Sequence, residues 1–372
     1  MTPFTALMIV PTGLGAEVGG YAGDATPAAN LLAAACDRLV THPNVVNAAS
    51  LFAARSNVWY VEGGMLDRFC LREGVLRPVR ANRVGLLIDR TIVDADPEGL
   101  LHLLTAADAC RAVQGVPMVG WLATCEPVRS RIVLGAMGAS SGEVENPEVL
   151  LEGARALLAQ GATAIALVTR MPELPEAETE AYLAGSGPDP IGGLEAILSH
   201  IVTRALGVPC AHAPYESPDR PMRVDPRVAA ESVGFTFLPC ILEGLRRAPR
   251  LAPLAQKERG DLAFEQVDAV VAPWGACGGI PVLAAHHRGI PVIAVKGNAV
   301  ASQADPVSLG LSGVLEVGTY LEAAGALLAL KEGLSPQSIL RPLSPLPPLP
   351  APRWGGGGGS KRSEPPSRAQ GT

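Results

Sequence analysis

The chain has 372 residues, of which 48% are hydrophobic and 18% are charged, and this balance favours a globular α/β protein over a disordered or coiled-coil chain. The formal net charge is -6, and the part expected to fold contains no basic run, which argues against nucleic acid as a partner. No apolar stretch approaches the roughly 20 residues that cross a bilayer, so the sequence predicts neither a transmembrane helix nor a membrane partner.

The cysteines and the N-terminal residues indicate in which cellular compartment the protein resides. Seven cysteines are spread along the chain without a CxxC pair, a pattern that argues against a disulfide framework and against a metal site. Residues 4–10 have the pattern of a strand and lack the basic segment and apolar core of a secretion signal. We therefore predict reduced thiols and a cytoplasmic location.

Short apolar runs bounded by Gly, Pro, Asn or Asp predict the strands. In chain order these are residues 6–10, 58–61, 84–88, 116–122, 164–169, 208–212, 267–272 and 291–296. Between them lie segments with helical spacing, namely residues 25–40, 97–113, 147–160, 192–206, 227–233, 239–247, 281–288 and 320–331. This alternation predicts mostly parallel sheets flanked by helices, with ligands at the carboxyl ends of strands.

The same pattern predicts the domain organisation. We expect two Rossmann-like α/β lobes, residues 1–170 and 171–334, because residues 171–190 are rich in Pro, Gly and acids and are typical of a surface loop. Residues 335–372 contain repeated prolines and then five consecutive glycines. Such a composition cannot bury enough apolar area to fold, so we predict a disordered tail.

The first candidate segment for function is PTGLGAEVGGYAGD, residues 11–24, directly after the first strand. Its glycines let backbone amides approach a ligand, and the next helix offers a positive N-terminal dipole. We therefore predict that Thr12, Gly13 and Gly15 bind substrate. The alternative is a long ordered turn whose glycines only satisfy backbone geometry.

The second candidate is THPNVVN, residues 41–47, where His42 and Asn47 present polar groups on one short connection. Both are candidate substrate ligands. The alternative is that His42 only caps the end of the preceding helix.

The third candidate is residues 189–214. On a regular strand Cys210 and His212 face the same side, and His200 on the preceding helix points toward them. A thiol and an imidazole on one face suit a nucleophile with its base, or a pair of soft metal ligands. A buried structural cysteine beside a hydrogen-bonded histidine is the alternative.

The fourth candidate is residues 267–298, a strand, a Gly-rich turn, a helix and a second strand. Cys277 lies at a predicted helix N-terminus, where the dipole lowers the pKa of a thiol and the amides of Gly278 and Gly279 can hold an anion. Lys296 and Asn298 end the second strand at the same predicted edge. The alternative is a merely structural turn.

The order of PTGLGAEVGGYAGD, THPNVVN, YVEGGMLDRF, GGLEAILSHIVTRALGVPCAHAP, GFTFLPCILEGL and ACGG with GIPVIAVKGN resembles the domain-of-unknown-function 3326 family of cyanobacteria and plant plastids. The resemblance spans about residues 1–334, and it implies no particular reaction.

Together these segments favour an enzyme that acts on a small anionic metabolite, phosphorylated or carboxylate, in a cleft between the lobes. Cys277 is the predicted catalytic thiol, and Cys210 or His212 is its predicted counterpart. A non-catalytic protein that binds a nucleotide or phosphorylated metabolite is one alternative, and an assembly or scaffold factor is another. The sequence identifies no cofactor, and it is compatible with a homo-oligomer.

Overall fold

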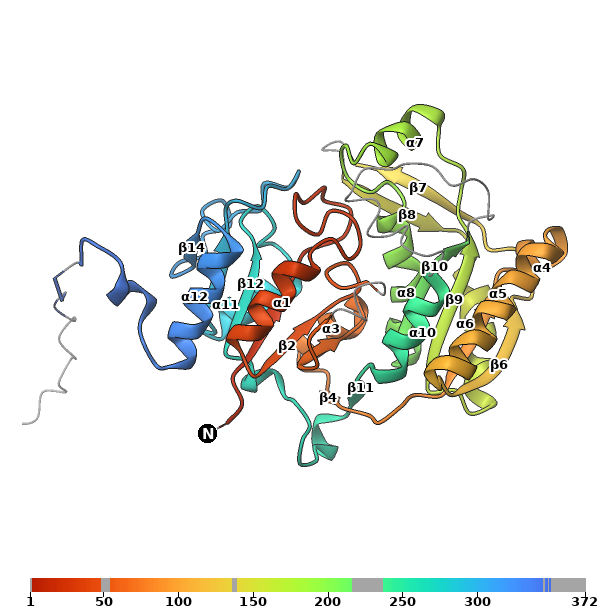
Figure 1. The fold of residues 1–372 in the computed structure, drawn as a ribbon, viewed down its shortest axis with the longest axis horizontal. Helices are drawn as coiled ribbons and strands as arrows, with labels where there is room; N and C mark the ends of the chain where they lie inside the picture. Colours follow the sequence, from red (N-terminus) through yellow and green to blue (C-terminus); the bar gives the residue numbers. More distant parts are fainter. Residues whose placement is uncertain are drawn as a thin grey trace, which may run out of the picture. The chain divides into compact units, whose positions relative to one another are not determined.

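The larger of two parallel sheets contains strands from both the beginning and the end of the folded chain (Figure 1). The computed structural model describes residues 2–47, 54–135, 139–215, 237–343, 345, 346 and 348. The six-stranded sheet has the order β14-β13-β12-β1-β2-β3, and all neighbouring pairs are parallel. Its strands are β1 Thr5–Met8, β2 Arg38–Thr41, β3 Val58–Tyr60, β12 Ala269–Pro273, β13 Val292–Val295 and β14 Leu315–Val317.

The second sheet is formed by the middle of the chain. It has the order β10-β9-β5-β6 and is also parallel throughout. Its strands are β5 Val84–Ile88, β6 Met118–Ala123, β9 Ala164–Arg170 and β10 Cys210–Tyr215. The predicted fold class, parallel sheets flanked by helices, is thereby confirmed.

The two sheets do not divide the chain at residue 170, where the sequence analysis places the boundary between lobes. That point falls between β9 and β10, which are paired neighbours in one sheet. The central strand β1 lies between β2 and β12, which come from opposite ends of the chain. Residues 1–334 accordingly form one compact unit, and residues 335–372 form a second, which includes the turn Pro336–Ile339.

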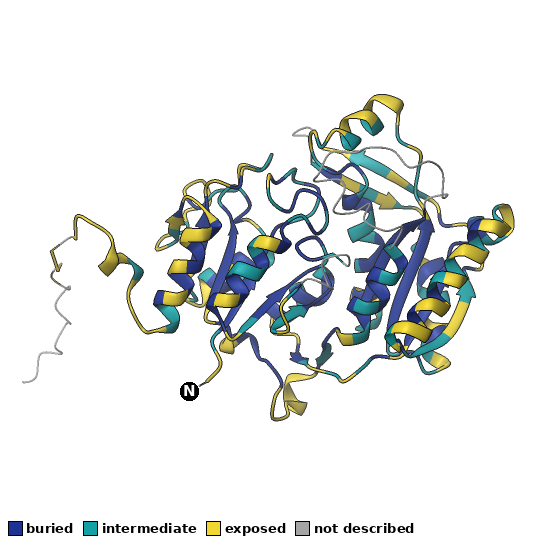
Figure 2. Cartoon of the chain, in the orientation of Figure 1, coloured by how far each residue is buried: buried dark blue, intermediate teal, exposed yellow. Residues whose placement is uncertain are grey.

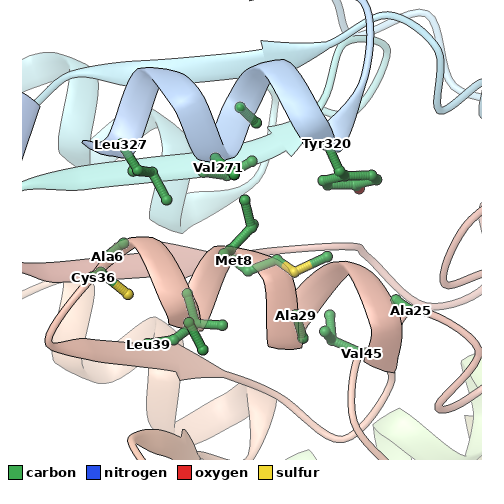
Figure 3. Close-up of a cluster of buried hydrophobic side chains, with 14 of the residues drawn as sticks. Ala6, Met8, Ala25, Ala29, Cys36, Leu39, Val45, Val271, Tyr320 and Leu327 are labelled. Carbon is green, nitrogen blue, oxygen red and sulfur yellow. The ribbon is translucent and has the colours of Figure 1, made fainter. Parts of the chain in front are cut away.

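Helices cover both faces of the larger sheet. On one face α1 (Thr26–Ala35) and α12 (Tyr320–Lys331) enclose a cluster that includes Met8 and Leu327 (Figure 3). On the other face α3 (Gly63–Cys70) and α11 (Ile280–His287) bury side chains against the same strands. Burial on both faces explains why these strands are continuous apolar runs in the sequence (Figure 2).

The smaller sheet is covered in the same way. One face packs against α6 (Pro147–Ala159) and α8 (Gly192–Leu206), and the other against α5 (Pro97–Ala109) and α10 (Phe237–Arg247). The remaining elements are short: α4 Arg90–Ala95, α7 Glu176–Leu183, the π-helical turn Cys110–Gln114, the 3-10 turns Leu254–Gln256 and Phe264–Gln266, and two antiparallel pairs, β4 Val75–Arg77 with β11 Arg250–Ala252 and β7 Ser130–Leu134 with β8 Ser140–Val144.

Three sequence predictions of local structure need correction. The helix predicted for residues 25–40 ends at Ala35, and Arg38–Thr41 form β2 because they pair with β1. The predicted loop at residues 171–190 contains the exposed helix α7. The pattern also missed α3, which begins with two glycines of low helix propensity.

Two predictions fall on residues that the structure does not describe. The helix predicted for residues 227–233 lies outside the described ranges, as does the predicted disordered tail beyond residue 348. Within the described ranges, every helix is too short or too polar to cross a bilayer.

Candidate functional site

A cavity of about 360 Å³ lies at the carboxyl edge of the larger sheet. Its floor comes from the residues that follow four adjacent strands, among them Thr12 after β1, His42 after β2, Glu62 after β3 and Gly279 after β12. Parallel strands end at the same edge of a sheet, so these residues converge although they are far apart in the chain.

The opposite wall is one face of α8. Gly192, Glu195, Ala196, Ser199 and His200 line the cavity at spacings of three and four residues, which place side chains on one side of a helix. His212 of β10, the strand that follows α8, also lines the cavity. The cavity therefore lies between the larger sheet and the helix and strand of the smaller sheet, within residues 1–334.

The main ion pair of the site joins α3 to α8. His200 Nε2 lies 3.1 Å from Glu62 Oε1, and the Glu62 side chain is almost completely buried. Glu62 also caps α3, because its oxygens accept hydrogen bonds from the N–H groups of Gly64 and Met65. The pair thus links the N-terminus of α3, which packs against the larger sheet, to α8, which packs against the smaller sheet.

The two partners shift each other's pKa toward the charged forms. Burial alone would raise the pKa of Glu62, but the hydrogen bond and charge of His200 outweigh it, and the net pKa is lowered. Burial alone would lower the pKa of His200, but the hydrogen bond and charge of Glu62 outweigh it, and the net pKa is raised. Each partner therefore favours the charged form of the other, carboxylate for Glu62 and imidazolium for His200.

Gly63 makes this pair possible. A Cβ atom on residue 63 would lie 2.7 Å from His200 Nε2, so any other residue there would displace the imidazole. The glycine that opens α3 is thus required by the close approach of the His200 ring.

His42 is a neutral hydrogen-bond donor at the floor. Its Nε2 accepts a hydrogen bond of 3.1 Å from the N–H of Val10, so Nδ1 carries the ring proton. Burial first, and then the nearby charge of His200, lowers the pKa of His42 to about 4. His42, which the sequence marks as a candidate substrate ligand, lines the cavity.

His212 is the second neutral histidine. Its Nε2 lies 2.8 Å from Thr169 Oγ1, whereas Nδ1 is buried and has no hydrogen-bond partner in the described part of the chain. Glu195 Oε1 lies 4.0 Å from Nδ1, beyond hydrogen-bond range. Burial lowers the pKa of His212 to about 3.

Asp189 lies at the start of α8, next to Thr12. Its Oδ1 accepts hydrogen bonds from the N–H groups of Ile191 and Gly192. Burial raises the pKa of Asp189 to about 6, although these two amides act in the opposite direction. No lysine or arginine is among the cavity-lining residues of the described chain.

The start of α11 also opens on the cavity. Gly279 is its N-cap, no side chain caps this end, and Pro281 in the first turn has no N–H to satisfy. The other N–H groups of a first helical turn have no acceptor within their own helix and carry partial positive charge. This end can receive a negatively charged or carbonyl oxygen.

The two cysteines predicted to do chemistry lie elsewhere. Cys210 and Cys277 are completely buried in apolar clusters, and neither lines the cavity. Burial raises the pKa of Cys277 to about 11, opposite to the lowering expected from a helix N-terminus. The N–H of Cys277 donates to the carbonyl of Ala304 at 2.8 Å, so this amide is already engaged.

The glycines predicted for the first loop have packing roles. A Cβ on Gly13 would lie 2.5 Å from the carbonyl oxygen of Ser140, and one on Gly15 would lie 3.2 Å from the nitrogen of Pro188. Both glycines also have positive φ. Of the predicted residues in this loop, Thr12 alone lines the cavity.

The other predicted ligands are engaged in the protein itself. Asn47 Nδ2 donates to the carbonyl of Ala22 at 2.7 Å, and Asn298 forms two hydrogen bonds with the backbone of Val18. Lys296 forms an ion pair with Glu316 and lies 4.7 Å from the ring centre of Trp274. A Cβ on Gly278 would approach Ala304 to 3.1 Å. None of these four predicted residues lines the cavity.

Sequence reasoning did not select the acids of the site. Glu62, Asp189 and Glu195 are ordinary acids in the sequence, and the sequence directs His200 toward Cys210 and His212 and does not pair it with Glu62. A signal was present, because Glu62 precedes the Gly-Gly start of α3 as an N-cap does. In the described part of the chain, no cluster of three or more His, Cys, Asp or Glu has the arrangement of a metal site.

These features define a parallel α/β protein with a ligand-sized cavity at the carboxyl edge of one sheet. A family model described as "Protein of unknown function (DUF3326)" matches residues 5–340, and the chain belongs to this family. The chain is also 43% identical over 337 residues to an "uncharacterized lipoprotein" of Synechococcus sp., an alignment that covers 90% of this chain and 93% of the relative. The family resemblance noted in the sequence is confirmed.

Proposed function

We propose that the protein is an enzyme that transfers protons on a small carboxylate bound in the cavity, with His200 as the proton-transferring group. The observation that carries the proposal is the pair of buried Glu62 and partly exposed His200, which opens on a cavity that is also lined by two neutral histidines. Groups whose pKa values are shifted in opposite directions within one cavity are typical of acid–base catalysis. Glu62 is a positioning residue, because it holds the ring and favours its protonated form.

The neutral histidines have a separate role. His42 has its ring proton on Nδ1 and stays uncharged, so it can donate a hydrogen bond to an oxygen that gains negative charge without competing for the proton. His200 supplies or accepts the proton itself. This assignment replaces the thiol chemistry expected from the sequence, because Cys277 is buried and is not among the residues that line the cavity.

A carboxylate fits the cavity better than a phosphate, the other anion expected from the sequence. The start of α11 supports one anionic group through backbone amides. A phosphate would bring up to two negative charges next to Glu62, Asp67, Asp189 and Glu195, and the described residues of the lining include no lysine or arginine. We therefore assign the substrate a carboxylate, held by the first turn of α11.

Solvent exchange tests the chemistry. In D₂O, the protein should replace hydrogen next to the carbonyl or carboxyl carbon of at least one small 2-oxo or 2-hydroxy carboxylate, as followed by proton NMR. We expect His200→Gln to slow exchange by about 100-fold or more, the usual value of a general acid or base. His286→Gln, a change at the far end of α11, is the matched control.

A backbone substitution tests the carboxylate site. Gly279 has φ −75°, which proline tolerates, so Gly279→Pro removes one N–H, whereas Gly279→Ala keeps it. Loss of a charge-assisted hydrogen bond should weaken carboxylate binding by about 10-fold or more in the proline variant alone. Binding without exchange would instead favour the non-catalytic binding protein, and no binding of any small molecule would favour the scaffold factor.

We also propose that this chain resides in the cytoplasm, although the relative from Synechococcus sp. is named a lipoprotein. All seven cysteines are free, and six of them are buried. We expect the cytosolic fraction to contain the unlipidated chain; a lipid-modified chain recovered from the membrane fraction would contradict this proposal.

A further inference from the structure

We infer that the ligand of the cavity carries a hydroxyl group as well as a carboxylate, so that the substrate class is a small hydroxycarboxylate. The inference rests on the proposed function for the carboxylate end. It adds a second subsite, formed by Nδ1 of His212 and Oε1 of Glu195, that binds the hydroxyl group. Both residues line the same cavity as Gly279, the N-cap of α11.

His212 supplies the observation on which the subsite rests. Its side chain is 1% exposed, and Nδ1 is buried without a hydrogen-bond partner among the described residues. The other ring nitrogen, Nε2, lies 2.8 Å from Thr169 Oγ1. A buried polar atom that lacks a partner is costly and is rare in folded proteins. Nδ1 is therefore the ring nitrogen that remains for a ligand.

Two strands of the smaller sheet hold this ring in place. His212 of β10 is opposite Leu167 of β9 in the parallel pair, and Thr169 follows two residues later, so His212 and Thr169 project from the same face of the sheet. That face packs against α8, which carries Glu195. The ring thus has a fixed hydroxyl group at Nε2 and a carboxyl group near Nδ1.

Thr169 determines which ring nitrogen of His212 carries the proton. Its hydroxyl has two acceptors within reach, Nε2 of His212 at 2.8 Å and the sulfur of Met171 at 3.8 Å. A ring nitrogen is a stronger acceptor than a thioether, so the hydroxyl donates to Nε2. The ring is neutral, because burial lowers the pKa of His212 to about 3, and its single proton is then on Nδ1.

The donor Nδ1–H lies beside an acceptor that it does not reach. Glu195 Oε1 is 4.0 Å from Nδ1, and at this separation one ligand oxygen can lie about 2.9 Å from both atoms. That oxygen has to accept a hydrogen bond from His212 and donate one to Glu195. A carboxyl group has several acceptor positions, so this requirement holds whatever other contacts Glu195 makes.

A hydroxyl group meets both requirements, because it has one O–H donor and two lone pairs. A ketone oxygen accepts from Nδ1–H, but it has no proton for Glu195. An ammonium group has three donors, but it cannot accept from Nδ1–H. The subsite therefore favours a hydroxyl group over the other two polar groups that are common in small carboxylates.

Thermal stabilisation by matched small molecules tests the subsite. Propanoate and butanoate are compared with their hydroxy, oxo and amino derivatives, each substituted at the same carbon atom. We expect at least one hydroxy acid to bind about 10-fold or more tightly than its unsubstituted, oxo and amino counterparts, because a site built around a hydroxyl group rejects analogues that lack it. The best position of the hydroxyl group reports its spacing from the carboxylate.

Two substitutions of His212 locate the hydroxyl group. A glutamine amide takes the place of Nε2 beside Thr169, whereas an asparagine amide takes the place of Nδ1. In His212→Gln we expect the hydroxy acid to bind no more tightly than the unsubstituted acid, and in His212→Asn we expect it to keep an advantage. Asp67→Asn is the matched control in the cavity lining and should keep the full advantage.

Proton NMR of the wild type gives a measurement that does not depend on the folding of a variant. The signal of the His212 Nδ1–H proton should shift when the hydroxy acid is added and should stay in place with the unsubstituted acid. Equal responses to the two acids would contradict a contact between Nδ1–H and the hydroxyl group.

The outcomes separate this inference from the proposed function. Equal binding of hydroxy and unsubstituted acids, or stronger binding of oxo or amino acids, overturns the hydroxyl subsite while the carboxylate enzyme stands. A hydroxy acid advantage that survives His212→Gln, or that is lost in His212→Asn as well, also overturns it. Preferential hydroxy acid binding without solvent exchange supports the inference and overturns the proposed reaction. No binding of any of these acids overturns both.

Discussion

The free energy of unfolding should fall steeply as the pH is lowered from about 6.5 toward 4, because His42 and His212 are buried in the neutral form. Their pKa values are lowered by burial to about 4 and about 3, below the value of about 6.5 in the unfolded chain. Between these values the unfolded state binds more protons than the folded state. Stability is therefore present above about pH 6.5 and is lost as the pH falls through this window.

The contribution of His212 can be isolated by substitution. His212→Gln retains a polar group beside Thr169 Oγ1 but does not take up a proton. Between pH 7 and pH 5 the free energy of unfolding should fall by about 2 kcal/mol more for the wild type than for this variant. A single titrating group contributes up to about 1.4 kcal/mol per pH unit between its folded and unfolded pKa values. Denaturant unfolding at a series of pH values measures the difference.

Asp189 has the opposite effect on the pH dependence of stability, and the comparison of wild type and variant must account for it. Its pKa is raised to about 6, so its protonation adds stability as the pH falls below that value. His102→Gln is the control, because this histidine lies exposed on α5, in water in both states. If His212→Gln and the wild type lose the same stability between pH 7 and pH 5, the buried neutral histidine is not the cause.

Gly193→Ala should destabilise the protein by about 3 kcal/mol, a typical cost of forcing an atom into a packed interior. Gly193 is the second residue of α8, and a Cβ there would lie 2.5 Å from the carbonyl carbon of Ser140 and 2.6 Å from the nitrogen of Ser141. These are backbone atoms of β8 and cannot rotate away. The helix must therefore move away from the hairpin, and Glu195 and His200 move with it.

A second glycine supplies the matched control. Gly325 lies within α12 on its exposed side, and a Cβ there would meet no atom within 4 Å. Gly325→Ala should stabilise the protein by about 0.5–1 kcal/mol, because alanine is the better helix former. Thermal or denaturant unfolding measures both variants. A Gly193→Ala protein as stable as the wild type would mean that α8 does not pack tightly against β8.

The amino-acid sequence by itself determined the class of the fold and the place of several elements. Strands buried on both faces are continuous apolar runs, so β5, β9 and β13 are recognisable without tertiary information. The predicted bounds of α8 agree with the structure because glycines flank it, and Gly207 adopts the left-handed conformation that ends a helix. The expectation that strand ends carry the ligand surface follows from the same parallel alternation, and the cavity lies there.

Only the tertiary structure decided which residues share a sheet and which share a site. Arg38–Thr41 form a strand because β1 and β3 pair with them, and nothing local distinguishes them from the end of α1. Glu62 and His200 meet because α3 packs against α8, yet each is an ordinary polar residue in its own segment. Cys277 is an ordinary candidate nucleophile in the sequence, but packing against its neighbours excludes it from the cavity and raises its pKa. The burial of a side chain and its contacts with distant residues result from the packing of the whole chain, so local sequence patterns do not predict them.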